Sequence, residues 1–108
     1  MMVKKTWTAV LIASAAALTF ATPAHADPDS DFARELHTYG IYGQKDFNAW
    51  IGKIACKRLD RGVDVTAADS AKFVSDQLLR GSSTEQAYQF LGAAMNYYCP
   101  DKRALLTQ

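Results

Sequence analysis

The sequence predicts an all-α fold, a small bundle of about four helices stapled by one disulfide. Apolar residues recur at intervals of three and four along four segments. Glycines separate these segments, and residues that cap helices precede several of them. No segment alternates polar and apolar residues over the length of a strand, and the β-branched cluster at residues 63–66 is short and polar.

The first predicted helix is capped by Ser30 and carries Phe32, Leu36 and Tyr39 at i, i+4 and i+7 spacing. Gly40 ends it, because glycine adopts the positive φ that follows many helices. The polar residues 27–30 are predicted to be a partly disordered lead.

The second predicted helix spans residues 45–61 and has the strongest periodicity in the chain. Gly43 precedes it in a turn, and Gly62 follows it. Its apolar positions are Phe47, Trp50, Ile51, Ile54, Ala55 and Leu59. Because this apolar arc is wide, the helix is expected to contact neighbours on two sides.

A Thr66–Asp69 capping box begins the third predicted helix, and Gly81 ends it after Arg80 has placed a cation in the last turn. Its apolar stripe consists of Ala67, Ala71, Val74 and Leu78.

A Ser82–Glu85 capping box begins the fourth predicted helix, and Pro100 ends it at about Tyr98. Its stripe consists of Ala87, Leu91, Ala94 and Tyr98. Residues 101–108 are compatible with a last helical turn or with a frayed end.

Residues 1–26 are predicted to be a secretory signal peptide. Lys4 and Lys5 precede an apolar run that is too short for a membrane span, which needs roughly 20 residues, and Ala24 and Ala26 suit signal peptidase. We expect cleavage after Ala26, which leaves residues 27–108 as a single helical domain with no stable membrane span. The predicted localisation is extracellular or in the cell envelope.

Residues 27–108 are nearly neutral. Without Lys4 and Lys5 the basic count falls from 12 to 10 against 11 acidic residues, so the net charge is 10 − 11 = −1. Nucleic-acid binding requires a basic surface, which this balance does not supply. A short basic cluster, predicted to be the solvated face of the second helix, consists of Lys53, Lys57, Arg58 and Arg61.

Cys56 and Cys99 are the two cysteines of the chain. In an oxidising compartment, a pair with no cysteine left over is most simply a disulfide. A structural zinc ion would need three or four ligands, and His37 is the one histidine after residue 26. A redox pair would place both sulfurs close together in sequence at an exposed helix start.

No catalytic, cofactor-binding or metal-binding residues are predicted. His37 lies near a helix end, where its interaction with the last carbonyls explains it, and no Gly-x-Ser-x-Gly elbow is present. Four carboxylates are expected next to turns, caps and exposed faces, at Asp60, Asp64, Asp69 and Asp76.

Aromatic residues are numerous for a small domain. Those predicted to be buried are Phe32, Phe47, Phe90 and Tyr98. Tyr39, Tyr42 and Trp50 flank the first turn and are the candidates for a partner surface, because Tyr and Trp have one apolar and one polar end. The alternative is that these three cover the end of the bundle. Tyr97 lies off its helix stripe and is predicted to be free.

A recognisable pattern runs through the chain and consists of Phe32, Leu36, Gly40-Ile41, Cys56, Leu59, Gly62, Gln86-Ala87, Ala94 and Tyr98-Cys99-Pro100. By this pattern the chain resembles the domain of unknown function 732 family, small exported proteins of mycobacteria and their relatives. The resemblance implies a secreted, helical, single-disulfide domain of unestablished role, and it brings no catalytic residues with it.

The predicted function is therefore that of a non-enzymatic binding module that contacts an unknown protein or envelope component. The second hypothesis is a carrier of a small apolar ligand or haem, with His37, Tyr39 or Tyr42 in contact. The third is a small envelope hydrolase, which would need a pocket that holds two carboxylates.

Overall fold

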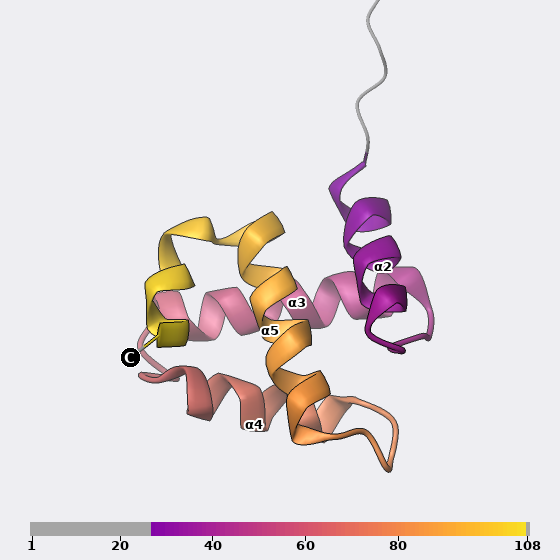
Figure 1. The fold of residues 1–108 in the computed structure, drawn as a ribbon. Helices are drawn as coiled ribbons and strands as arrows, with labels where there is room; N and C mark the ends of the chain where they lie inside the picture. The colour runs from indigo at the N-terminus through magenta and orange to yellow at the C-terminus, as the bar shows by residue number, and fades with distance from the viewer. Residues whose placement is uncertain (1–26, 108) are drawn as a thin grey trace, which may run out of the picture.

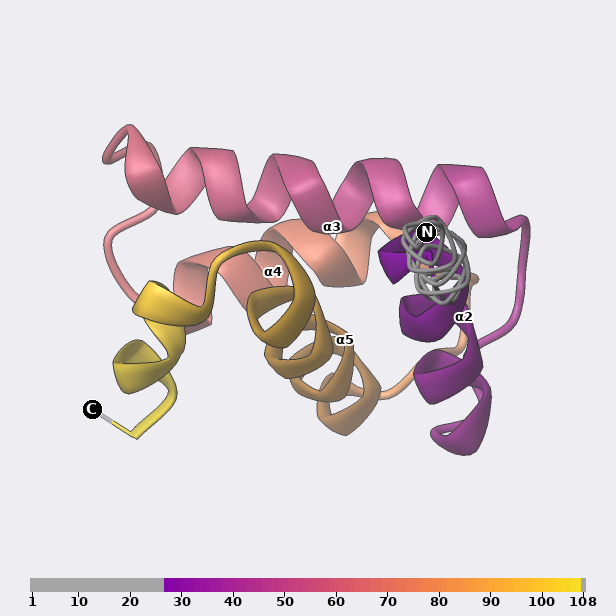
Figure 2. The same ribbon diagram turned by 90° about the horizontal axis from the view of Figure 1, so that it is seen from above.

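The computed structural model describes residues 27–107, and this part of the chain is all-α, as predicted. The elements are α2 (Pro28–Thr38), α3 (Lys45–Asp60), α4 (Ala67–Gln77), α5 (Thr84–Tyr98) and a 3₁₀ helix, η2 (Pro100–Thr107). Helix α3 runs along one side of the molecule, with α2, α4 and α5 packed on its inner side (Figure 1, Figure 2). The predicted signal peptide, residues 1–26, lies outside the described residues.

The core is centred where α2, α3 and α5 meet. Phe32 and Phe90 are fully buried, and their rings meet edge to face with centroids 5.2 Å apart. A Cβ atom at Gly52 would lie 3.1 Å from the Tyr98 ring and 3.2 Å from the Phe32 ring. The glycine therefore lets α3 approach both aromatic rings more closely than any other residue would allow.

Helix α2 begins at Pro28, so the prediction that Ser30 caps it was wrong. Asp27 is the N-cap residue, and Pro28 stands in the first turn, where its fixed φ favours a helix and its missing N–H costs nothing. Ser30 lies inside the helix and donates a hydrogen bond to the Asp27 carboxylate at 3.1 Å.

Helix α3 begins and ends close to the predicted positions, and the Thr66–Asp69 capping box of α4 is confirmed. Helix α4 ends earlier than predicted, at Gln77, because Leu78 takes an extended conformation with ψ 167°. Arg80 therefore lies in the connection to α5 and not in the last turn of a helix.

The capping box of α5 is Ser83 with Gln86, one residue later than predicted. The Gln86 amide accepts from the Ser83 N–H at 2.9 Å and donates to the Tyr39 carbonyl at 3.0 Å. A glutamate carboxylate at this position could not make the second bond, because it has no hydrogen to donate. Gln86 thus ties the start of α5 to the turn between α2 and α3.

Asp64 follows the turn after α3, as predicted, but it is buried, at 4% exposure, and does not lie on an exposed face. Its carboxylate accepts from Arg58 Nε at 2.8 Å and from the Ser70 hydroxyl at 3.1 Å. The Arg58 guanidinium lies 4.4 Å from the centroid of the Phe73 ring. Arg58 is therefore not part of a purely solvated basic face, since it joins the end of α3 to α4.

Tyr98 is only partly buried, and its hydroxyl donates to Asp29 Oδ1 at 2.7 Å. Lys53 contacts the other oxygen of Asp29 at 3.3 Å. Tyr97 was predicted to be free, but it packs against the core with its ring 6.1 Å from that of Phe32. Both tyrosines hold α2 against α5.

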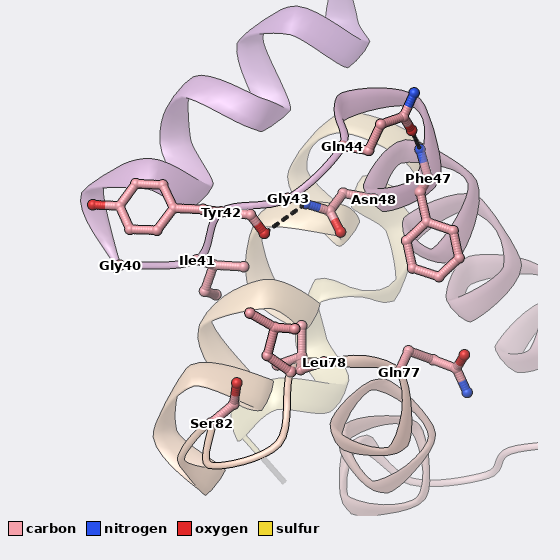
Figure 3. Close-up of a pocket in the computed structure, with 11 residues that line it drawn as sticks. Gly40, Ile41, Tyr42, Gly43, Gln44, Phe47, Asn48, Gln77, Leu78 and Ser82 are labelled. Atoms are coloured by element: carbon pink, nitrogen blue, oxygen red, sulfur yellow. Dashed lines mark hydrogen bonds between the residues drawn. The ribbon is translucent and has the colours of Figure 1, made fainter.

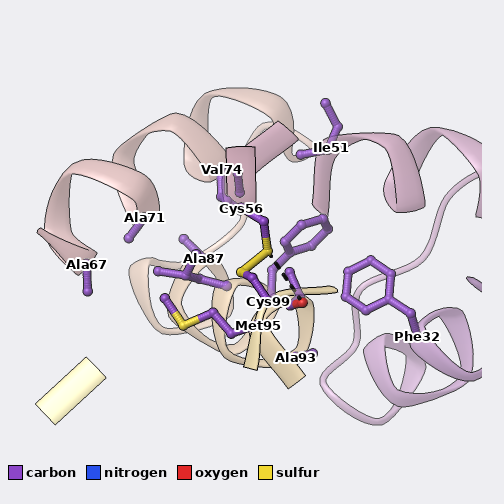
Figure 4. Packing of buried hydrophobic residues seen from close by; sticks show 14 of the residues in the cluster. Phe32, Ile51, Cys56, Ala67, Ala71, Val74, Ala87, Ala93, Met95 and Cys99 are labelled. Atoms are coloured by element: carbon purple, nitrogen blue, oxygen red, sulfur yellow. Dashed lines mark hydrogen bonds between the residues drawn. A yellow bond between two sulfur atoms is a disulfide. The ribbon is translucent and has the colours of Figure 1, made fainter. Parts of the chain in front are cut away.

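The predicted disulfide is present between Cys56 and Cys99, and Figure 4 shows it inside the core cluster beside Met95. Cys56 lies on α3, and Cys99 ends α5 in a non-helical conformation at φ −154°, as expected before a proline. The bond therefore fixes the end of α5 to α3.

Replacing Cys56 or Cys99 with Ser is expected to lower the melting temperature sharply. The bond closes a loop with a sequence separation of 43, for which the chain-entropy model gives about 4 kcal/mol against a total stability of about 5–15 kcal/mol. The measurement is thermal unfolding followed by circular dichroism with and without reductant. The melting temperature of the double variant Cys56→Ser/Cys99→Ser should not change when reductant is added. Equal melting temperatures of the oxidised and reduced native protein would contradict a stabilising disulfide.

The variant Tyr98→Phe is expected to lower the free energy of unfolding by about 1 kcal/mol, because it removes the hydrogen bond to Asp29. That bond, together with Lys53, holds the pKa of the Asp29 carboxyl below its ordinary value of 3.8. A carboxyl whose pKa is lowered by folding stabilises the fold at pH values above its pKa in the unfolded chain. This stabilisation is lost as the pH falls from that value through the lower pKa of the folded protein.

Melting temperatures measured from about pH 5 to pH 2 test this linkage, because the stabilisation is lost mainly below the ordinary pKa of 3.8. The native protein should lose stability more steeply than Tyr98→Phe. Parallel curves for the two proteins would show that the hydrogen bond does not set the pKa of Asp29.

Candidate functional site

An apolar cleft opens between two turns of the bundle, the one joining α2 to α3 and the one joining α4 to α5 (Figure 3). Its volume is about 160 Å³. The side chains that surround it include Ile41, Tyr42, Phe47, Asn48, Gln77, Leu78, Leu79 and Ser82. No charged side chain lines it, so the cleft favours an uncharged, largely apolar group.

The turn between α2 and α3 forms one wall of the cleft. Gly40 has φ 78° and Gly43 has φ 127°, which other residues rarely adopt. The Ile41 N–H donates to the Leu36 carbonyl at 3.0 Å and closes the end of α2. Ile41 is consequently buried, and the next side chain, Tyr42, points outward and is 63% exposed.

The beginning of α3 forms the adjoining wall. Gln44 caps the helix by accepting from the Phe47 N–H at 2.7 Å. The Asn48 side chain, only 7% exposed, donates to the Tyr42 carbonyl at 3.5 Å. These bonds join the turn to the helix and hold the backbone at Phe47.

Three apolar side chains at the cleft are exposed to solvent, namely Tyr42, Phe47 and Leu79. Leu79 is 76% exposed because α4 has already ended at Gln77. Large apolar side chains grouped around a cleft mark a contact surface more specifically than the same residues scattered singly.

Phe47 was predicted to be buried, and that prediction was wrong, since its side chain is 43% exposed. The buried face of α3 is centred on Ala55 and Leu59. Phe47 and Trp50 lie on the opposite side, with their rings 6.0 Å apart and Trp50 56% exposed. The wide apolar arc of α3 combines these exposed aromatic residues with a buried face that contacts α2, α4 and α5, so the predicted contact with more than one neighbour is confirmed.

Of the three residues predicted to form a partner surface, only Tyr42 lines the cleft. Trp50 lies beside it, in contact with Phe47. Tyr39 is half-buried, and its hydroxyl donates to Glu35 at 2.6 Å. That hydrogen bond and burial raise the pKa of Tyr39 to about 12, so its hydroxyl stays protonated at neutral pH and acts mainly as a structural link between residues of α2.

His37 lies in the last turn of α2, where its proximity to the final carbonyls was predicted. It is exposed, and its ring centroid lies 5.1 Å from that of Tyr42. Across residues 27–107, no group of three or more His, Cys, Asp and Glu side chains is arranged to hold a metal ion. None of the helices in that range has the length and apolar character needed to cross a membrane.

Sequence reasoning missed Leu79 and misplaced Phe47. One signal could have indicated that Leu79 is exposed. Leu79 directly follows Leu78, the last residue of the predicted apolar stripe, and in a helix the next side chain points about 100° away from that stripe. No local signal placed the two turns next to each other, because they are far apart in sequence.

A family model described as "Protein of unknown function (DUF732)" matches residues 28–101, which include all four described α-helices. Two uncharacterized proteins of Mycobacterium tuberculosis, from strains CDC 1551 / Oshkosh and ATCC 25618 / H37Rv, are each 50% identical to this chain over 92 residues. The aligned region is 84% of this chain and 82% of each relative. No solved structure matches the chain. The resemblance inferred from the sequence motifs is thereby confirmed.

Proposed function

We propose that this chain, which belongs to the DUF732 family of proteins of unknown function, is an exported, non-enzymatic binding module. The observation that carries the proposal is the uncharged cleft with Tyr42, Phe47 and Leu79 exposed around it. The partner we infer is a protein or another envelope component that inserts an apolar group between these three side chains.

The size of the cleft supports contact with a single side chain. Sites for small-molecule ligands have volumes of about 300–1,000 Å³ and enclose most of the ligand. A cleft of about 160 Å³ is too small for haem, and it suits one apolar anchor residue. This argues against the cleft as the binding site of a haem carrier, the second hypothesis from the sequence.

A hydrolase is the less favoured alternative, because no carboxylate lines the cleft and two carboxylates near the turns, Asp64 and Asp69, already have partners. Asp64 is held by Arg58 and Ser70. Asp69 accepts from the backbone N–H groups of Val65 and Thr66, which lowers the pKa of its carboxyl. Neither residue lines the cleft, so the cleft offers no acid–base pair.

The start of the first described helix and the start of the family match both support export with cleavage after Ala26. Helix α2 begins at Pro28, and the family match also begins at residue 28. All the described helices therefore lie after the proposed cleavage site and are retained when the leader is removed. Only Asp27, the N-cap residue, would stand between the new terminus and the helix.

The double variant Tyr42→Ser/Leu79→Ser is expected to reduce capture of the envelope partner at least about tenfold, because it removes two anchoring side chains. Stability should change by less than about 0.5 kcal/mol, since both side chains are exposed. The measurement compares proteins retained from mycobacterial envelope extracts by the immobilised native and variant proteins, with thermal unfolding of each.

The matched control is Val63→Ser/Val65→Ser, which removes two side chains that are 61% and 70% exposed but lie outside the cleft. It should retain full capture. Equal loss in both variants, or no loss in either, would exclude the cleft as the binding site. Haem absorbance and lipid titrations of Trp50 fluorescence should stay flat, and saturable binding in either would favour a carrier instead.

The form exported by a mycobacterial host is expected to begin at Asp27, as measured by intact mass and N-terminal sequencing. The variant Ala26→Tyr should retain residues 1–26, because signal peptidase requires a small residue before the cleaved bond. An exported native form that still contains Met1–Ala26 would contradict the proposal.

A further inference from the structure

The outer face of α3 carries an ordered row of exposed side chains. Figure 2 shows α3 at the edge of the molecule, with the other described helices on its inner side. Asp46, Trp50, Lys57 and Arg61 are exposed and follow one another at intervals of four, seven and four. Because an α-helix turns by about 100° per residue, these intervals place the first three within one narrow stripe, and Arg61, the C-cap residue directly after α3, continues it. We call Asp46, Trp50, Lys57 and Arg61 the outer stripe.

The charges of the outer stripe make no ion pair with any residue in the range 27–107, whereas the charges beside the stripe do. Lys53 contacts Asp29 at 3.3 Å, and Asp60 contacts Lys102 at 3.4 Å. The stripe therefore presents one negative charge at its beginning and two positive charges toward its end, separated by an indole ring.

We propose that the outer stripe binds the same stripe of a second copy of this chain, with the two α3 helices antiparallel. Asp46 and Arg61 lie equally far from the midpoint of the stripe, and so do Trp50 and Lys57. A two-fold axis at that midpoint places Asp46 opposite Arg61 of the second copy, and Trp50 opposite its Lys57. Each contact then occurs twice, as two-fold symmetry requires.

The chemistry of these contacts favours the antiparallel arrangement. Asp46 with Arg61 is a carboxylate–guanidinium pair, and Lys57 over the Trp50 indole is a cation–π contact. A parallel arrangement in register would instead place like charges opposite each other. Antiparallel helices also bring the positive end of one helix dipole to the negative end of the other.

The pairing is expected to be weak. A 16-residue helix is about 24 Å long, so a contact confined to α3 falls at the small end of interface sizes. Association at concentrations of about 10 μM to 1 mM is the corresponding expectation.

This inference goes beyond the proposed binding function and does not depend on it. The cleft lies on the flank of α3 that carries Phe47 and Asn48, and no residue of the outer stripe lines it. The cleft variant Tyr42→Ser/Leu79→Ser should therefore leave self-association unchanged, so the two proposals can fail separately.

Sedimentation equilibrium of the purified, oxidised protein tests the proposal. The native protein should form a dimer as its concentration rises. Asp46→Arg and Arg61→Asp should each raise the dissociation constant at least about tenfold, since each places like charges opposite one another. The double variant Asp46→Arg/Arg61→Asp reverses both charges of the pair and should restore association to within about threefold of the native protein.

The matched controls are Asp76→Arg and Arg80→Asp, which make the same charge changes at exposed positions outside the stripe. Both should leave the dissociation constant unchanged. A native protein that stays monomeric up to about 1 mM overturns the proposal. A dimer that the single variants do not weaken, or that the double variant does not restore, also overturns it. Circular dichroism of each variant confirms that the fold is retained.

Discussion

The bond between Cys56 and Cys99 and the packing directly beside it hold the molecule together. The disulfide joins α3 to the end of α5, and Tyr98, the residue before the second cysteine, packs on Gly52 of α3 and reaches Asp29 of α2 through its hydroxyl. Three helices are thereby joined within a short distance. A core this small needs such a link. The free energy gained by burying its apolar area only narrowly exceeds the free-energy cost of the conformational entropy lost on folding.

The inner side of α3 packs against the other helices. Its two remaining faces differ in chemistry. The flank toward α4 carries Phe47 and borders an uncharged cleft suited to an apolar anchor. The outer stripe carries one negative charge, an indole ring and two positive charges, and we propose that it pairs with the same stripe of a second copy. One helix thus offers two separate surfaces, distinguished by whether recognition depends on apolar shape or on charge.

The shape of the cleft depends on polar side chains more than on the core. Gln86 holds the turn between α2 and α3 through the Tyr39 carbonyl, and Asn48 holds the same turn through the Tyr42 carbonyl. Both bonds are made by amides, which donate and accept at once. They keep this exposed turn in one conformation. The turn can therefore present the exposed Tyr42 side chain and still form a defined wall of the cleft.

The sequence by itself determined the helical class, the glycine turns, the Thr66–Asp69 capping box and the disulfide, because each depends on nearby residues or, for the disulfide, on there being two cysteines. Local periodicity could not distinguish an aromatic residue that faces the core from one that faces solvent, so Phe47 was misplaced. It also could not show that Asp64 is buried by Arg58, or that Gln86 reaches the Tyr39 carbonyl. Only the tertiary structure decided these points and the cleft itself, because they depend on which turns and helices, distant in sequence, become neighbours in space.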